Sequence, residues 1–235
     1  MKRIAIIPAR GGSKRIPRKN IKPFMGEPMI SYPIKAALRS GLFDMVMVST
    51  DDIEIAETAL LHGAEVPFMR SDENSDDYSG TGNVMVEVLD RLNEKGEYFD
   101  LACCIYATTP LIRKERIIQA HRLIEKTSYD AVFPVGKYNS PIWRSYSVDA
   151  QALATMNFPE YDAFRSQDLP NSYFDSGQFY WFYPNVIKGL KNPNTFGNFK
   201  GVIELEDWEF HDIDEESDWK MAELKFKAHQ IERYE

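Results

Sequence analysis

The sequence has 235 residues, 43% of them hydrophobic, and a formal net charge of -8. This size and composition predict one domain over residues 1–235 with a single large core, and no apolar run reaches the roughly 18 residues that a membrane span requires. Broad binding to duplex nucleic acid is not expected either, because it depends on neutralising many phosphates and this chain is acidic.

Short apolar runs alternate with longer amphipathic segments in the first part of the chain. The expected strands cover residues 3–9, 45–49, 65–69, 101–106 and 131–135. The expected helices cover residues 29–40, 53–62, 81–95 and 113–126. The second helix is capped by Asp51 or Asp52, and its apolar face is expected to comprise Ile53, Ala56, Ala59 and Leu60.

The pattern changes between about residues 136 and 173, where Pro, Ser and Asn interrupt short pieces of sequence. This segment is expected to form an inserted lobe of hairpins and loops. Strands are expected again at 177–183 and 201–205, followed by a last helix over 217–233. The alternation of strands and helices predicts an α/β fold with a doubly wound, mainly parallel sheet and helices on both faces.

The two cysteines, Cys103 and Cys104, are adjacent and lie within the apolar strand expected at 101–106. Adjacent cysteines in such a run are typical of buried, reduced thiols. We therefore expect a cytoplasmic protein without disulfides.

The segment after the first strand is strongly basic. Residues 2–22 contain eight Lys and Arg and no Asp or Glu, although the whole chain has 36 acidic and 28 basic residues. Ligands of doubly wound folds bind beyond the carboxyl ends of the strands, where this loop would lie. Gly11 and Gly12 could adopt positive φ angles and expose their N–H groups, and Ser13 adds a hydroxyl. These features predict a phosphate-binding loop, with a localisation-like run or a solvated loop as the alternatives.

The stretch IPARGGSKRIPRKNI resembles the signature of the acylneuraminate cytidylyltransferases, which activate nine-carbon acidic sugars as CMP-sugars, and further matches run through nearly the whole chain. The resemblance implies a nucleotide-diphospho-sugar transferase-like, Rossmann-like fold. It places the triphosphate of CTP on Arg10 and Lys19, whose charges would stabilise the transition state of attack at the α phosphorus. The remaining residues that it places around the nucleotide in this loop are Gly11, Gly12, Ser13 and Asn20.

A second nucleotide-binding element of that family corresponds to Arg70, Ser79 and Thr81. From the residues alone, Arg70 also fits an ordinary surface charge. Ser79 and Thr81 also fit helix caps.

The opposite end of the chain is acidic, with nine Asp and Glu and no Lys or Arg over residues 204–218. If the stretch HDID is extended, Asp212 and Asp214 project to the same side, about 7 Å apart at Cα. Two carboxylates on one face suit Mg²⁺, which joins one or two carboxylates to substrate phosphates. The alternative is helix capping by Asp214, and the resemblance also assigns Mg²⁺ to this pair.

The stretch RSQDLPNSYFDSGQFYW separates the subfamilies. The resemblance places Arg165 and Gln167 on the acidic-sugar side of the cleft, where a guanidinium can bind a carboxylate bidentately. The part DSGQFYW with Asp175, like SPIWRSY with Arg144, is similar to the members that act on pseudaminic acid, whereas sialic acid enzymes usually carry Asn-Gly. Tyr106 stands where sialic acid enzymes have a sugar-contacting Gln, and it also fits a packing role.

The expected reaction converts CTP and pseudaminic acid to CMP-pseudaminic acid and pyrophosphate, with Mg²⁺ as cofactor and a surface glycan as the destination. The alternatives are the same reaction with legionaminic, sialic or another ulosonic acid, a non-catalytic nucleotide-sugar binder, and a glycosyltransferase. The general base stays open among Asp175, Asp212, Asp214 and a metal-bound hydroxide. The resemblance also implies a homodimer that pairs through the lobe at 136–173.

Overall fold

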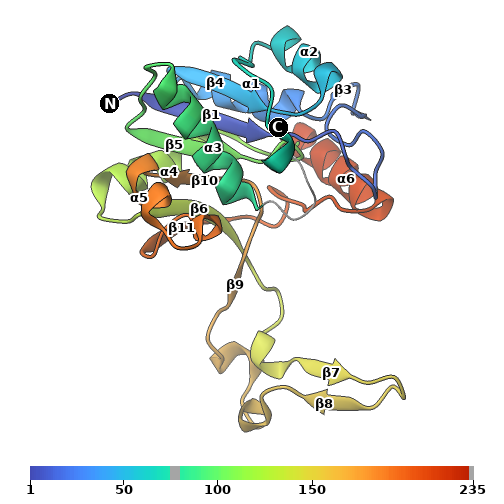
Figure 1. Cartoon of the computed structure of the whole chain (residues 1–235). Coiled ribbons are helices and arrows are strands. Elements are labelled where there is room, and N and C mark those ends of the chain that lie inside the picture. The colour runs from blue at the N-terminus through green and yellow to red at the C-terminus, as the bar shows by residue number, and fades with distance from the viewer. Residues whose placement is uncertain (75–79, 233–235) are drawn as a thin grey trace.

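The computed structural model describes residues 1–74 and 80–232, which form a sheet covered by helices and an arm that extends away from this body (Figure 1). In this part of the chain the main sheet has seven strands in the order β11-β6-β10-β5-β1-β4, with β9 also pairing with β6. Its strands are β1 (Arg3–Pro8), β4 (Met45–Ser49), β5 (Leu101–Ile105), β6 (Ala131–Lys137), β9 (Tyr173–Asp175), β10 (Phe179–Phe182) and β11 (Lys200–Leu205). The doubly wound, mainly parallel α/β fold predicted from the sequence is confirmed.

Helices cover both faces of this sheet (Figure 1). They are α1 (Ser31–Ser40), α2 (Ile53–Leu61), α3 (Thr81–Glu94), α4 (Lys114–Lys126), α5 (Pro184–Gly189) and α6 (Glu216–Glu232). Buried residues of α1, α2 and α4 belong to the core on one face, and those of α3 and α5 belong to the core on the other. None of the helices within the described residues has the length and apolarity of a membrane span.

The remaining elements are short. The 3-10 helices are η1 (Asp72–Asn74), η2 (Ile142–Arg144), η3 (Pro159–Tyr161), η4 (Ser166–Asp168) and η5 (Pro193–Thr195). Two small hairpins consist of β2 (Pro23–Phe24) with β3 (Glu27–Pro28), and β7 (Tyr146–Val148) with β8 (Ala154–Met156).

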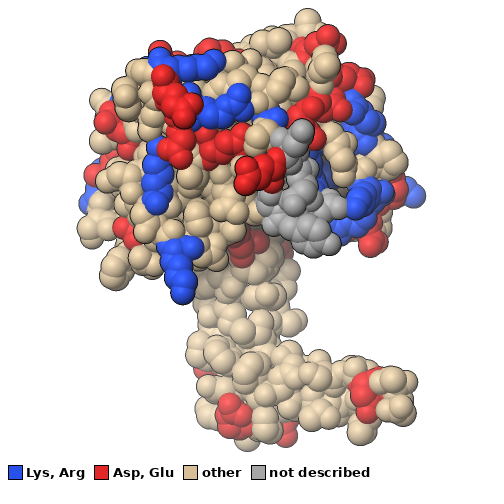
Figure 2. Space-filling model, viewed as in Figure 1, with Lys and Arg blue, Asp and Glu red and all other residues tan. Residues whose placement is uncertain are grey.

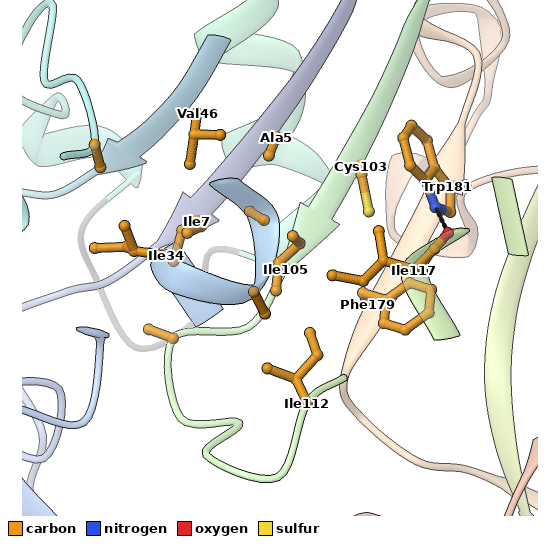
Figure 3. Packing of buried hydrophobic residues seen from close by; sticks show 14 of the residues in the cluster. Ala5, Ile7, Ile34, Val46, Cys103, Ile105, Ile112, Ile117, Phe179 and Trp181 are labelled. Atoms are coloured by element: carbon orange, nitrogen blue, oxygen red, sulfur yellow. Dashed lines mark hydrogen bonds between the residues drawn. The ribbon is translucent and has the colours of Figure 1, made fainter. Parts of the chain in front are cut away.

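The core follows from mostly apolar inner strands, such as β5, which is buried at every position, as strands covered by helices on both faces require. In β1, Ala5 and Ile7 point to the α1/α4 side, while the alternate residues point to α3. Figure 3 shows this packing, in which the Trp181 indole lies against Ile117 and donates a hydrogen bond of 3.1 Å to its carbonyl oxygen. Cys103 and Cys104 are free and buried in β5, as predicted.

One strand prediction is wrong, and another strand runs in a direction that the sequence did not indicate. The segment at 65–69 forms only an isolated bridge between Glu65 and Met47, because Pro67 cannot continue the ladder of hydrogen bonds. The run at 177–183 does form a strand, β10, but it pairs antiparallel to both β5 and β6. It can run in this direction because the chain returns to the sheet through the arm and not through a crossover helix.

The second helix buries only part of the face expected: Ala56 and Ala59 are buried as predicted, whereas Ile53 and Leu60 are not. Asp52 caps it by accepting a hydrogen bond of 3.0 Å from the backbone N–H of Ile55. Ile53 and Leu60 are 71% and 56% exposed, and Ile55 is buried in their place. The buried face is rotated relative to the expected one because the helix contacts the sheet through Ile55 and Ala59, which lie one turn apart.

The segment expected as an inserted lobe leaves the sheet after β6 and returns through β9 (Figure 1). Its far end holds the β7–β8 hairpin, and near it Trp143 packs against Phe158 and Tyr161. Many of its apolar side chains are exposed, namely Tyr138, Tyr146, Val148, Leu153, Phe164 and Tyr173. On the face seen in Figure 2 the arm shows mostly uncharged groups with a few acidic ones, whereas charges are spread over the body.

A third cluster of buried residues joins the two ends of the chain. Phe24 lies edge-to-face against Trp219 and Phe226 of α6, at ring-centroid distances of 5.5 and 5.6 Å. Ile16 and Ile213 are fully buried in the same cluster. The basic segment near the N-terminus and the acidic segment before α6 are therefore held beside each other.

Gly82 in the first turn of α3 is a point of close contact with η5. A Cβ at this position would overlap the backbone of Pro193, and the Gly82 N–H donates to the Asn194 side chain at 2.7 Å. We expect Gly82→Ala to lower the free energy of unfolding by about 1–3 kcal/mol, despite the better helix propensity of alanine. Thermal unfolding measures the effect. Gly189→Ala, which meets no atom within 4 Å, should leave the Tm nearly unchanged, and an equal change in both variants would contradict the explanation.

Candidate active site

A cavity of about 670 Å³ lies where β1 and β5 end, at the carboxyl edge of the sheet. The structure brings together around it most of the nucleotide-binding residues expected from the sequence. Its lining includes Arg10, Ser13, Lys14, Arg15, Lys19, Asn20, Arg70, Thr81, Tyr106 and Asp214. Several cations surrounding one cavity make it suitable for a polyanion such as a triphosphate.

The two glycines of the basic loop have a different role from the one expected. Neither Gly11 nor Gly12 has a positive φ angle, and the Gly11 N–H donates a hydrogen bond of 2.9 Å to the Asp51 carboxylate, so it is not available to a bound phosphate. A Cβ on Gly11 would lie 2.7 Å from a carboxylate oxygen of Asp52. Gly11 is therefore required for close approach of the loop to the start of α2, and the predicted anion nest is wrong for these residues.

Other contacts hold the loop in shape. Arg18 has a left-handed φ of 57° and is paired with Asp52 and Glu54. These bonds, with the carboxylate charges, raise its pKa. Asn20 is buried and donates a hydrogen bond of 2.8 Å to the Arg10 carbonyl oxygen. Arg18 thus braces the loop from outside the cavity, and Asn20 braces it from within the cavity wall.

Lys19 links the loop to the acidic segment. Its ammonium donates to the Ile213 carbonyl oxygen at 2.6 Å and lies 3.9 Å from Asp214, which also pairs with Arg15 at 2.7 Å. Burial lowers the pKa of Lys19. The charge segregation of the sequence therefore becomes a local pairing of basic and acidic groups at one edge of the cavity.

Asp212 and Asp214 flank the fully buried Ile213, in the alternation expected for an extended stretch. Partial burial and the charge of Asp214 raise the pKa of Asp212. Asp214 does not cap α6 through its side chain: Asp218 accepts hydrogen bonds from the N–H groups of Asp214 and Glu215, at 3.0 and 2.8 Å. The capping alternative for Asp214 is thus wrong.

No cluster of three or more His, Cys, Asp or Glu suited to a metal exists among the described residues. The available donors are the two aspartates beside a cationic cavity. This set fits Mg²⁺, which takes one or two protein carboxylates and completes its shell with phosphates and water.

Arg70 is 8% exposed and forms part of the cavity wall, so it is not a surface charge. Its guanidinium donates to the carbonyl oxygen and, at 3.1 Å, to the hydroxyl of Ser49, and burial lowers its pKa. Thr81 is the first residue of α3 and follows the cap residue Gly80. Its hydroxyl lies 3.3 Å from the Tyr106 hydroxyl. Ser79 lies outside the described residues.

A second cavity of about 270 Å³ adjoins the first and shares Thr81 and Tyr106 with it. Three further rings line it, with Tyr180 stacked on both Phe133 and Phe196. Its polar lining includes Asp175, which accepts a hydrogen bond of 2.5 Å from the Tyr180 hydroxyl. Burial raises the pKa of Tyr106 to about 12. An aromatic cavity with a few polar groups suits a substituted sugar.

The remaining sugar-binding candidates lie elsewhere. Arg144, Arg165 and Gln167 are in the arm, in or beside η2 and η4, and none of them lines either cavity described above. The Arg165 side chain is 72% exposed and pairs with Asp168 at 2.6 Å. Within one chain, the structure therefore brings Tyr106 and Asp175 together and keeps these three residues away from them.

Sequence reasoning did not identify several residues of the second cavity, namely Phe133, Tyr180, Asn194, Phe196 and Lys200. They come from β6, β10, η5 and β11, and no motif links them. Their meeting depends on the strand order, which a local pattern does not reveal.

The family profile described as Cytidylyltransferase matches residues 4–231. The chain is 38% identical over 228 residues to a pseudaminic acid cytidylyltransferase of Campylobacter jejuni, covering 97% of each chain. It is 34% identical to a CMP-N,N'-diacetyllegionaminic acid synthase of Legionella pneumophila, covering 64% of this chain and 65% of that one. The fold matches a CMP:2-keto-3-deoxy-manno-octonic acid synthetase solved with CTP, with a TM-score of 0.71 and 16% identity over 97% of this chain and 100% of that chain. By the profile and the relatives together, the chain belongs to the cytidylyltransferase family.

Proposed function

We propose that this protein transfers the cytidylyl group of CTP to pseudaminic acid, giving CMP-pseudaminic acid and pyrophosphate. The observation that carries the proposal is the pair of adjoining cavities, one cationic and one aromatic, that share Thr81 and Tyr106. The similarity along 97% of both chains to the Campylobacter jejuni enzyme supports the choice of sugar.

The triphosphate would lie in the larger cavity against Arg10, Lys19 and Arg70. The anomeric oxygen attacks the α phosphorus while the bond to pyrophosphate breaks, and negative charge accumulates on the phosphate oxygens and the leaving group. Cations already in place stabilise this charge. A sugar held in the smaller cavity has its hydroxyl positioned for in-line attack. A Mg²⁺ held by Asp212 and Asp214 would supply further charge neutralisation on the phosphates.

The attacking hydroxyl must lose its proton as the new bond forms. Among the described residues, the candidate acceptors in and beside the two cavities are Asp175, Asp212 and Asp214. Comparing the pH–rate profiles of their Asn variants at saturating Mg²⁺ identifies the acceptor, because the proton then no longer competes with the metal and only the variant that lacks the base loses the acidic limb of the profile.

A panel of purified sugars tests the substrate. Pyrophosphate release is measured with CTP and pseudaminic, legionaminic or sialic acid, with and without Mg²⁺. We expect the largest kcat/KM with pseudaminic acid. Turnover of sialic or legionaminic acid but not pseudaminic acid would overturn the choice of sugar while leaving the reaction class intact. Binding of CTP without any pyrophosphate release would favour a nucleotide-sugar binder, and no use of free CTP would favour a glycosyltransferase.

We infer that the reaction takes place in the cytoplasm. The free, buried Cys103 and Cys104 support this location, because adjacent reduced thiols suit a reducing compartment.

We further infer that the protein is a homodimer in which the arm of one copy reaches the aromatic cavity of the other. Two features support this arrangement. The arm exposes apolar side chains, and Arg144 and Arg165 lie on it, away from their own chain's cavities. In a symmetric pair, each arm would supply the partner's site with a cation for the sugar carboxylate.

Mixing two inactive variants tests this arrangement. Lys19→Ala disables the phosphate site of the chain that carries the substitution. Arg165→Ala disables the arm that its chain supplies to the partner's site. In an equal, re-equilibrated mixture, roughly one quarter of the sites would combine an intact loop with an intact arm, so activity should return to about that fraction of wild type. Activity no higher than the mean of the two variants would show that Arg165 acts within its own chain or has no role.

A further inference from the structure

Glu209 is a buried carboxylate outside both cavities. It is 1% exposed and lies in the irregular segment between β11 and α6 that carries Asp212 and Asp214. Arg116 binds both of its oxygens, at 3.0, 3.1 and 2.5 Å, and Arg113 binds one of them at 3.0 Å. The N–H of Glu206 donates to it at 3.0 Å as well.

These bonds connect three segments that carry site residues. Arg113 directly follows the loop after β5, whose first residues, Tyr106 to Thr108, line the nucleotide cavity. The buried side chain of Gln178, three residues after Asp175, donates to the Glu209 carbonyl oxygen at 2.6 Å. Glu209 itself is three residues before Asp212. Glu209 is thus connected to the loop that lines the nucleotide cavity and to the segment that carries Asp175 of the sugar cavity. It also lies in the segment that carries the aspartate pair.

The geometry points to Glu209 as a positioning residue that sets the Asp212–Asp214 pair relative to the two cavities, a role that rests on the proposed function. The segment from 206 to 215 contains no strand or helix, so its place depends on side-chain bonds and on the burial of Phe210 and Ile213. The bonds at Glu209 join this segment to α4. The bond from Lys19 to the Ile213 carbonyl oxygen joins the segment to the basic loop.

The charge of Glu209 matters to this role. A buried carboxylate is stable only when charged, well-aligned donors surround it, and without it two partly buried guanidinium groups would each lose their buried anionic partner. Burial alone would raise the pKa of Glu209, but the bonds from Arg116 and the Glu206 N–H lower it below its ordinary value. The carboxylate therefore stays ionised and keeps both arginines, and α4 with them, against the segment.

Glu209→Gln removes the charge and keeps the shape. Hydrogen–deuterium exchange on the ligand-free protein should be faster in residues 106–113, 175–178 and 206–214. Isothermal titration of Mg²⁺ in the presence of CTP should show about tenfold weaker binding, and kcat should fall by a similar factor, as for other residues that orient metal ligands. The Kd for CTP without Mg²⁺ should change less than the Mg²⁺ affinity does, because Glu209 makes no bond to the basic loop that supplies most of the cations of the cavity.

Glu204→Gln is the matched control, since Glu204 is an exposed acid in β11 and should behave as wild type. If Glu209→Gln does not fold, Arg113→Lys, which leaves the bonds from Arg116 to Glu209, should give the same changes at smaller size. Unchanged exchange in the three segments of a folded variant would overturn the positioning role. If wild type neither binds Mg²⁺ with CTP nor turns over while exchange still rises in Glu209→Gln, the proposed function fails and the anchoring of the segments stands.

Discussion

Lys19→Ala is expected to lower kcat by a factor of about 10²–10³, because it removes a preorganised cation from the cavity where the phosphates gain charge. The side chain is held in place by the Ile213 carbonyl oxygen and Asp214. Steady-state measurement of pyrophosphate release gives the effect. Stability should also fall, by about 1–3 kcal/mol, because a partly buried charged hydrogen bond is lost.

The matched control is Lys22→Ala, at a lysine of the same basic segment that pairs with Glu216 and lies over the Trp219 ring. Lys22 does not line the nucleotide cavity, so kcat should stay within a factor of about two of wild type when the variant is folded. Equal loss of kcat in both variants would show that general charge, and not the position of Lys19, matters. Wild-type turnover of Lys19→Ala would refute its phosphate role.

Asp212→Asn is expected to raise the Mg²⁺ concentration for half-maximal activity by about tenfold or more, since loss of a direct ligand should cost at least as much as loss of a supporting residue. The raised pKa of Asp212 adds a pH dependence. As pH falls toward that pKa, the carboxyl takes up a proton that competes with the metal, so the Mg²⁺ requirement of wild type should rise at mildly acidic pH. Asn cannot titrate, and the variant should show less of this dependence.

Glu215→Gln changes an exposed acid next to this pair and serves as its control, with a Mg²⁺ titration that should match wild type. Titrations at neutral and mildly acidic pH on all three proteins separate loss of a ligand from loss of general negative charge. An unaltered titration for Asp212→Asn would remove Asp212 from the metal site. A shift of equal size in both variants would assign the effect to general charge.

Most elements of the fold could be predicted because their signals are local. The strands at 45–49 and 101–106 are short apolar runs, and the helix at 81–95 shows the helical period, which the structure confirms as β4, β5 and α3. The strand predicted at 65–69 was wrong because Pro67 interrupts it. The direction of β10 was missed because a strand buried on both faces has the same apolar pattern whether it runs parallel or antiparallel.

The candidate site could be predicted only in part, for a related reason. The basic loop was identified because a loop after the first strand of such a sheet lies at the ligand-binding edge. Phe133, Phe196 and Lys200 were not identified, because they meet only when β6 and β11 lie beyond β10. Arg70 gave no signal of burial, since a lone arginine at a strand end is usually exposed.

The sequence by itself determined the fold class, the position of the basic loop and the alternation that puts Asp212 and Asp214 on one side of Ile213. These properties depend on residues that are close in the sequence and on the side-chain repeats of two residues in a strand and 3.6 residues in a helix. Only the tertiary structure decided that Gly11 is needed for space beside Asp52, that Arg165 lies away from its own chain's cavities, and that Glu209 is buried between two arginines. These three features depend on which segments, distant in the sequence, meet in the fold. The free energy of burying a charge depends on the partners that these segments bring to it.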